Sequence, residues 1–205
     1  MMRSLITAAV LATVVLTSTA RAATLQTAVF AGGCFWGVEA VFEHVKGVKS
    51  VVSGYVGGTV VNPDYETVTS GRTGHAEAVK VTFDPAVVSY ETLLAVFFTV
   101  AHNPTELNRQ GPDVGTQYRS AIFFANAEQQ KSATTVIAQL TQAKAFPRPI
   151  VTQVASLSKF YDAEPYHQNY LYSHTDQPYI VYNDLPKIDA LKKQYPALWE
   201  KTQGK

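Results

Sequence analysis

One residue stands out for its chemistry: Cys34 is the only cysteine in this chain of 205 residues. It lies in the stretch AGGCFWGVE, residues 31–39, where a β-prone run at 27–31 gives way to apolar residues spaced three and four apart. Cys34 is therefore predicted at a turn from a strand into a helix, where the positive helix end can lower the pKa of a thiol. Because lone cysteines are often buried and inert, position alone leaves a nucleophile and a core residue about equally open.

Three other side chains could assist a reactive thiol. Phe35 and Trp36 place two large apolar faces beside the sulfur, which suits the binding of an apolar group. Glu77 lies where a long loop becomes a strand, and burial there would raise the pKa of its carboxyl so that it could act as an acid. Spacing alone favours the plainer interpretation of Glu77 as a solvent-facing strand residue.

The apolar pattern predicts the elements that must position these residues. Strands are expected at 27–31, 48–55, 76–83, 118–124 and 150–157, and helices after residue 34 and at 90–101, 126–144 and 187–195. Their order predicts an α+β fold: a ferredoxin-like, two-layer sandwich with a βαββαβ core and helices on one face, followed by an extra helix, an extra strand and a long irregular C-terminal tail. With 46% hydrophobic and 16% charged residues, one globular domain is expected.

The N-terminus has the pattern of a secretory signal peptide. A basic start at Arg3 precedes an apolar run at 5–16 that is too short to span a bilayer, and Ala20-Arg21-Ala22 is a small-x-small cleavage site. We therefore expect a signal peptide at 1–22, cleaved after Ala22, and a mature domain at 23–205 in the periplasm or secreted. An uncleaved anchor is the alternative.

Composition argues against several functional classes. Loss of the two arginines in the signal peptide leaves a mature net charge of about −1, so no basic field is expected for nucleic acid, and no membrane attachment is expected after cleavage. The five histidines show no metal-ligand spacing, so no metal is expected. A single cysteine cannot form an internal disulfide, so an exported thiol must be either buried or functional.

Motifs along the chain resemble those of a known enzyme family. They are GCFWGVE, GYVGG, NPDYETV, GRTGHAEAV, FDP, SYETLL, NRQGPDVGTQYRSAIF and FYDAEPYHQNY, in this order between residues 29 and 172. Together they resemble the A-type peptide methionine sulfoxide reductases, here in a one-cysteine form. The resemblance implies thiol-dependent reduction of methionine-S-sulfoxide, free or in proteins, through a sulfenic acid on Cys34, and thus repair of oxidative damage in exported proteins.

The resemblance also implies roles for individual residues. Glu77 matches the acid that protonates the substrate oxygen, and Tyr65 and Tyr118 match the phenols that bind this oxygen. Asp113 matches an aspartate that orders the site, while Phe35 and Trp36 would cage the substrate methyl group. Without the resemblance, the two tyrosines would be interpreted as half-buried core residues and Asp113 as a turn residue.

The chain departs from many relatives in two respects, its missing cysteines and one asparagine. Thr69 and the segment 177–180 lack the second and third cysteines with which many relatives form a disulfide. An external thiol must therefore reduce Cys34, and thioredoxin, glutaredoxin or a similar dithiol is expected as the reductant, with no bound cofactor and a monomeric enzyme. Asn103 stands where many relatives carry Asp, with no consequence that we can derive.

The sequence leaves two functions other than the reductase open. A cysteine hydrolase or acyltransferase would pair Cys34 with one of the five histidines and form an acyl-enzyme. A non-catalytic, exported peptide-binding module would use the tyrosine-rich loops and bind peptides even after Cys34 is alkylated.

Overall fold

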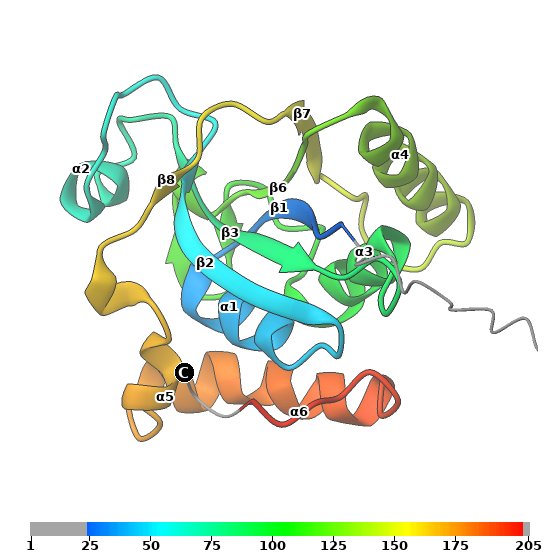
Figure 1. Ribbon diagram of the computed structural model, residues 1–205. Helices are drawn as coiled ribbons and strands as arrows, with labels where there is room; N and C mark the ends of the chain where they lie inside the picture. Colours follow the sequence, from blue (N-terminus) through cyan, green and yellow to red (C-terminus); the bar gives the residue numbers. More distant parts are fainter. Residues whose placement is uncertain (1–23, 203–205) are drawn as a thin grey trace, which may run out of the picture.

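The computed structural model describes residues 24–202, which form a six-stranded sheet with helices packed around it (Figure 1). Across the sheet the order is β7-β6-β1-β3-β2-β8, and β4 pairs with β5 in a separate hairpin. The signal peptide expected at 1–22 lies outside the described residues. The strands are β1 (Gln26–Gly32), β2 (Val48–Val56), β3 (Ala76–Phe83), β4 (Arg109–Gln110), β5 (Asp113–Val114), β6 (Ser120–Phe124), β7 (Gln153–Ser156) and β8 (Tyr161–Asp162).

The four central strands are interleaved. β3 lies between β1 and β2, which α1 (Phe35–Glu43) joins, and β1 lies between β3 and β6, whose connection contains α3 (Tyr90–Val96). Neighbouring strands among these four are antiparallel. This is the strand arrangement of a split βαβ unit, and the predicted α+β class is confirmed. The expected extra helix and strand are α4 (Ala127–Gln142) and β7, which pairs in parallel with β6.

The core follows from the alternation of side chains along β1. Phe30 points into the large core on the helical face, where its ring stacks on Phe42, Tyr90 and Phe97 at centroid distances of 5.1, 6.1 and 4.9 Å. Val29 belongs to a smaller cluster, which the segment 155–160 helps to cover. This packing holds β1 against α1, the two elements on either side of Cys34.

Three elements differ from the predicted ones. The long loop expected between the strands at 48–55 and 76–83 contains a short helix, α2 (Tyr65–Thr69), because Asp64 caps it by accepting a hydrogen bond from Thr67 N. The helix expected at 90–101 changes from α3 to a π-helical turn, Phe97–Ala101. The strand expected from Tyr118 begins only at Ser120, because Thr116–Tyr118 forms a 3-10 turn.

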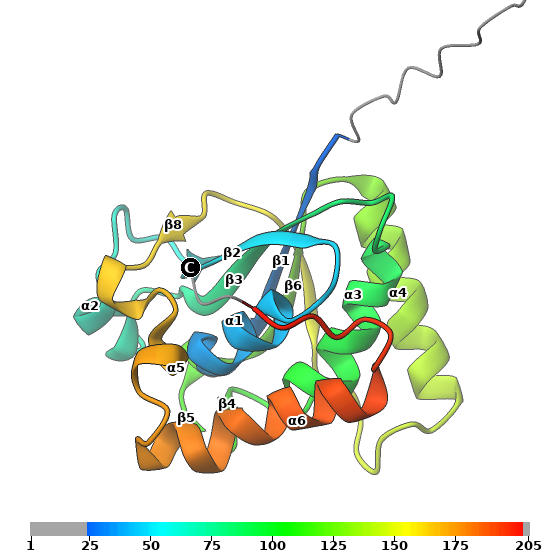
Figure 2. The same cartoon turned by 60° about the horizontal axis from the view of Figure 1, so that its bottom comes forward.

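The C-terminal tail holds more regular structure than expected. Besides α6 (Leu185–Gln194), it contains the 3-10 turn Pro165–His167, α5 (Tyr170–Ser173) and a π-helical turn, Ile180–Asp184. Figure 2 shows α5 and α6 lying along α1, and Val45 and Trp199 form a β-bridge beyond the end of α1. The tail thus covers the helix that begins at Cys34. Among residues 24–202, no helix has the length and apolar character needed to cross a membrane.

Candidate active site

Cys34 occupies the N-cap of α1, as the sequence predicted, and one turn residue, Gly33, separates it from the end of β1 at Gly32. Gly33 has a φ of +92°, and a Cβ there would lie 2.5 Å from the side chain of Gln110, so glycine is required in this turn. Cys34 is only 8% exposed. Burial raises the pKa of its thiol well above the ordinary value, and the Glu77 carboxyl adds to this effect. The expected lowering of the thiol pKa by the helix end is therefore wrong, because desolvation outweighs it.

Glu77 is the second residue of β3, and it is buried rather than solvent-facing. Its Oε2 accepts a hydrogen bond of 3.1 Å from the backbone N–H of Phe35, the residue that follows Cys34. Burial raises the pKa of the Glu77 carboxyl to about 8, although the Phe35 N–H opposes this rise. The carboxyl therefore keeps its proton at pH 7 and lies beside the thiol-bearing turn.

Tyr65 and Tyr118 come to the same region from different elements. Tyr65 is the first residue of α2, and Tyr118 ends the 3-10 turn before β6. Burial raises the pKa of Tyr65 to about 12, and negative charge at Glu77 and Cys34 contributes. Burial and the same two groups also raise the pKa of Tyr118. Both half-buried phenols thus remain hydrogen-bond donors at neutral pH.

Asp113 connects this region to the tail. It lies in β5, and its Oδ2 accepts a hydrogen bond from the hydroxyl of Tyr179. Partial burial raises the pKa of Asp113, whereas the Tyr179 hydrogen bond and the positive charge of Lys187 lower it. Asp113 is therefore more than a turn residue, because it holds a tail tyrosine against the site.

Phe35 and Trp36 have different environments. Phe35 is 1% exposed, with its ring 5.0 Å from His167 and 5.9 Å from Tyr55, so it forms an inner wall. Trp36 is half-buried and stacks on Tyr170 at 3.8 Å. Its Nε1 donates a hydrogen bond of 3.1 Å to His167 Nδ1, which fixes the plane of the indole.

The motif FYDAEPYHQNY also supplies site residues to which sequence reasoning assigned no role. Glu164 accepts hydrogen bonds of 2.8 Å from both the hydroxyl of Tyr55 and the backbone N–H of Tyr65. The ring of His167 lies 4.4 Å from that of Tyr65. The polar residues of this motif mark it as a candidate for function. Their hydrogen-bond partners lie in distant segments of the chain, so the sequence alone does not identify them.

A second group missed from the sequence is a buried ion pair in the tail. Asp184 is fully buried, and its Oδ1 lies 3.1 Å from Lys187 Nζ. The pair packs against Gly37 in the first turns of α1, where a Cβ would lie 2.0 Å from Asp184 Oδ1. The tail therefore places a charge pair next to the helix that Cys34 begins.

The histidines do not form the pair that an acyltransferase would need. Each one makes its hydrogen bonds elsewhere, and none of the bonds among the described residues joins a histidine to Cys34. His102, for example, contacts Ser120 Oγ at 2.6 Å, and burial lowers its pKa to about 4. Residues 24–202 also contain no group of three acidic, histidine or cysteine side chains that could hold a metal ion.

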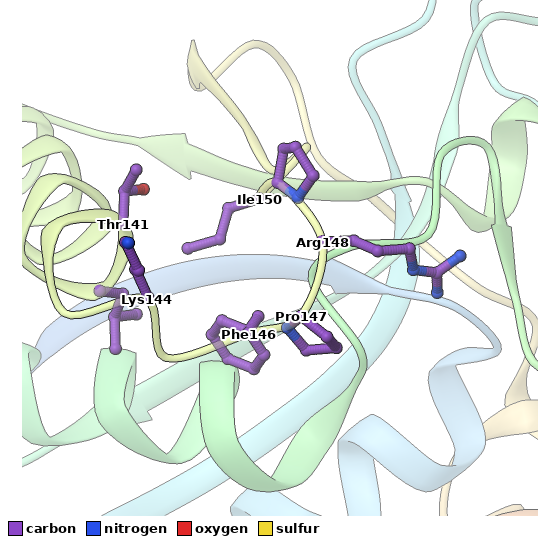
Figure 3. A pocket seen from close by; sticks show the side chains of 8 residues that line it. Thr141, Lys144, Phe146, Pro147, Arg148 and Ile150 are labelled. Carbon is purple, nitrogen blue, oxygen red and sulfur yellow. The ribbon is translucent and has the colours of Figure 1, made fainter.

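A surface groove of about 480 Å³ lies away from these residues, between the end of α4 and the loop before β7 (Figure 3). From this loop Ile150 extends toward α4, while Arg148 extends the other way. Its lining contains neither a thiol nor a carboxyl group. The candidate chemistry therefore belongs to Cys34 and its neighbours, not to this groove.

Comparison with known proteins agrees with this geometry. Residues 26–199 match the family model described as peptide methionine sulfoxide reductase. Peptide methionine sulfoxide reductase MsrA 2 of Mesorhizobium japonicum is 58% identical over 174 residues, which cover 85% of this chain and 89% of that protein. MsrA of Deinococcus radiodurans is 54% identical over 170 residues, which cover 83% and 82%. Reduced Mxr1 from Saccharomyces cerevisiae matches with a TM-score of 0.69 at 31% identity, covering 74% of this chain and 87% of that chain.

The family match spans nearly all of the described domain, and it includes the buried thiol, the protonated carboxyl and both phenols. The two bacterial relatives are more than 50% identical to this chain over most of their length, and the yeast structure shares its α+β fold. This chain therefore belongs to the peptide methionine sulfoxide reductase family.

Proposed function

We propose that this reductase acts on methionine-S-sulfoxide, free or in proteins, through Cys34 as the nucleophile. One observation carries the proposal: a buried carboxyl that keeps its proton at neutral pH is hydrogen-bonded to the residue next to the only thiol. A sulfoxide needs this pairing, because its oxygen must be protonated as the sulfur is attacked. The neutral phenols of Tyr65 and Tyr118 would hold the oxygen, as the donors of an oxyanion hole do.

The first step moves one oxygen atom from the substrate to the enzyme. The Cys34 sulfur bonds to the sulfoxide sulfur while Glu77 gives its proton to the oxygen, and the resulting carboxylate takes the proton of the thiol. The oxygen then passes to Cys34 as methionine leaves. A thiol and a sulfoxide are thereby converted to a sulfenic acid and a thioether, with all atoms balanced.

Recycling of Cys34 requires two external thiols. The first displaces the sulfenic oxygen as water and forms a mixed disulfide with Cys34. The second attacks this disulfide and releases Cys34 as a thiol. The yeast relative Mxr1 has been solved in complex with Trx2, which supports a thioredoxin-like reductant for this chain. Turnover with thioredoxin, glutaredoxin and a small dithiol, compared at equal thiol concentration, identifies the preferred donor.

The substrate assignment has a direct test. Purified enzyme is incubated with either the S or the R epimer of methionine sulfoxide, and a sulfenic acid trap is added after one turnover. Consumption of the S epimer with trap label on Cys34 is expected. Consumption of the R epimer alone, or turnover that leaves Cys34 unlabelled, would contradict the proposal.

We further propose that the enzyme is exported and repairs exported proteins as a monomer. The signal pattern at 1–22 supports export, and the absence of an internal disulfide partner for Cys34 is compatible with repeated reduction by an external thiol. N-terminal sequencing of the protein recovered from the periplasm should start at Ala23. Recovery of the full-length chain in the cytoplasm would refute export, and sedimentation equilibrium tests the monomer.

A further inference from the structure

The three groups proposed to handle the substrate oxygen come from separate segments. Tyr65 begins α2, Glu77 lies in β3, and Tyr118 ends a 3-10 turn some forty residues later in the chain. Their hydroxyl and carboxyl groups must nevertheless converge on one oxygen atom. Displacement of about 1 Å at such a site can cost about a hundredfold in rate, so a structural device must hold these segments in register.

The two neighbours of Tyr118 in the sequence are both buried and both reach the segment that carries the other groups. Gln117 is 4% exposed, and its Nε2 donates a hydrogen bond of 3.0 Å to the carbonyl of Thr69, the last residue of α2. Thr69 in turn donates from its hydroxyl to the carbonyl of Tyr65 at 2.8 Å. A continuous chain of hydrogen bonds therefore links the Tyr118 turn to Tyr65.

Arg119 makes the corresponding link on the other side. Its Nη2 donates to the carbonyl of Gly74 at 3.0 Å, three residues before Glu77 in the chain. Its Nη1 donates to the carbonyl of Thr116 at 2.8 Å, within its own turn. The guanidinium thus ties the Tyr118 turn to the entry of β3, and its burial makes these bonds costly to lose.

We infer that Gln117 and Arg119 are positioning residues that hold Tyr118 in register with Tyr65 and Glu77 by bonding to the backbone on either side of them. Neither side chain needs to touch the substrate. This inference rests on the proposed function, because it explains how that function's three oxygen-binding groups are kept together.

A substitution of Gln117 tests the positioning role with little disturbance elsewhere. Its Oε1 is buried without a hydrogen-bond partner among the described residues, so Gln117→Leu removes an unsatisfied acceptor together with the bond to Thr69. Removal of the unsatisfied acceptor partly offsets the loss of the Thr69 bond, so the free energy of unfolding should fall only modestly, while the register of α2 and the Tyr118 turn is released. The single-turnover rate with methionine-S-sulfoxide is expected to fall about 10- to 100-fold, with a smaller change in substrate affinity.

Gln129 provides the matched control. It is 5% exposed, and its Nε2 also donates to a backbone carbonyl, that of Thr27 at 2.7 Å, near the opposite end of β1 from Cys34. Gln129→Leu should lower the unfolding temperature and leave the single-turnover rate within about twofold of wild type. An equal rate loss in both variants would mean that Gln117 is merely structural, which would overturn the inference.

A double variant of Gln117 and Tyr118 distinguishes a positioning role from a purely structural one. If Gln117 acts through Tyr118, then Gln117→Leu should slow a Tyr118→Phe enzyme by less than about threefold, since the hydroxyl to be positioned is already gone. Rate losses that multiply in the double variant would overturn the inference. Arg119→Lys should keep part of the activity that Arg119→Met loses. Equal single-turnover rates in these two variants would also contradict the inference.

The outcomes for the inference and for the proposed function can be told apart. Oxidation of wild-type Cys34 by methionine-S-sulfoxide tests the function itself. A wild-type enzyme that reacts, next to a Gln117→Leu enzyme that reacts equally fast, removes only the positioning role.

Discussion

At the scale of single residues, the site combines two acids that are both uncharged at rest. The Cys34 thiol and the Glu77 carboxyl are buried, and burial is the largest cause of the raised pKa of each. Two negative charges this close together in a low dielectric would repel each other, so ionising one group makes ionising the other harder. In the proposed mechanism, transfer of the thiol proton to Glu77 is therefore favourable only after Glu77 has given its own proton to the substrate.

The pH dependence of the first step follows from this order. Glu77 donates its proton only below its raised pKa of about 8, so the single-turnover rate should fall as pH rises through 8. Glu77→Gln keeps an acceptor for the Phe35 N–H but has no acidic proton, so it should be about a hundredfold slower and lack this decline. Stopped-flow measurements from pH 6 to 10 check both. An alkaline decline that survives in Glu77→Gln would assign the titration to another group.

The same carboxyl makes the fold less stable at neutral pH than it would be with a neutral side chain. The folded pKa of Glu77 lies above the ordinary value, so its contribution to stability is fully present below about pH 4.5 and is lost as pH rises toward 8. Glu77→Gln should therefore unfold at a higher temperature than wild type at pH 8, with the difference shrinking toward pH 4.5. Thermal unfolding across this range measures it, and a variant less stable at pH 8 would refute the argument.

At the scale of elements, predictability depends on whether local sequence or distant packing forms the element. β1 and α1 were predicted because alternation and helical spacing around Cys34 are local signals. The helix α2 was missed because Pro63 and Asp64 are turn formers as well as helix-start residues. Part of the tail was missed because packing against α1, rather than its own periodicity, forms α5 and the turn at Ile180–Asp184.

Contact between the tail and α1 depends on Gly37. Alanine normally stabilises a helix relative to glycine by about 1 kcal/mol, but here its Cβ would lie 2.0 Å from Asp184 Oδ1 and 2.8 Å from Lys187 Nζ. Gly37→Ala should therefore displace the buried ion pair, destabilise the protein and lower reductase activity. Thermal unfolding and turnover check this prediction.

A second substitution separates this contact from a general helix effect. Asp184→Ala removes the carboxylate that the new methyl group would meet. The double variant Gly37→Ala, Asp184→Ala should therefore be more stable than expected from the sum of the two single effects. Additive losses would mean that the cost of Gly37→Ala arises elsewhere.

At the scale of the whole molecule, the site joins segments that are far apart in sequence. Cys34 follows β1, Glu77 lies in β3 and Asp113 lies in the separate β4–β5 hairpin. Tyr179 and Glu164 come from the tail. Spacing within any one segment could not group them. Resemblance to a family predicted that Cys34, Glu77 and Asp113 share a site, and nothing in the sequence predicted that Tyr179 and Glu164 join them. Glu164 lacked an assigned role because its partners, Tyr55 and Tyr65, lie about a hundred residues earlier in the chain. The Asp184–Lys187 pair is local in sequence, but its packing against Gly37 of α1 becomes visible only in the folded chain.

The single cysteine sets the stoichiometry of the whole enzyme. With no other thiol in the chain, oxidation of Cys34 cannot be relieved internally, so each molecule should release one methionine and then stop when no reductant is present. Rapid quench with quantification of methionine checks this, and thiol titration should show that the free thiol is lost in parallel. Cys34→Ser should release none. A burst of two methionines per chain would require a second redox group and would contradict the one-cysteine cycle. Addition of a dithiol should restore turnover, because the one-cysteine cycle needs an external reductant.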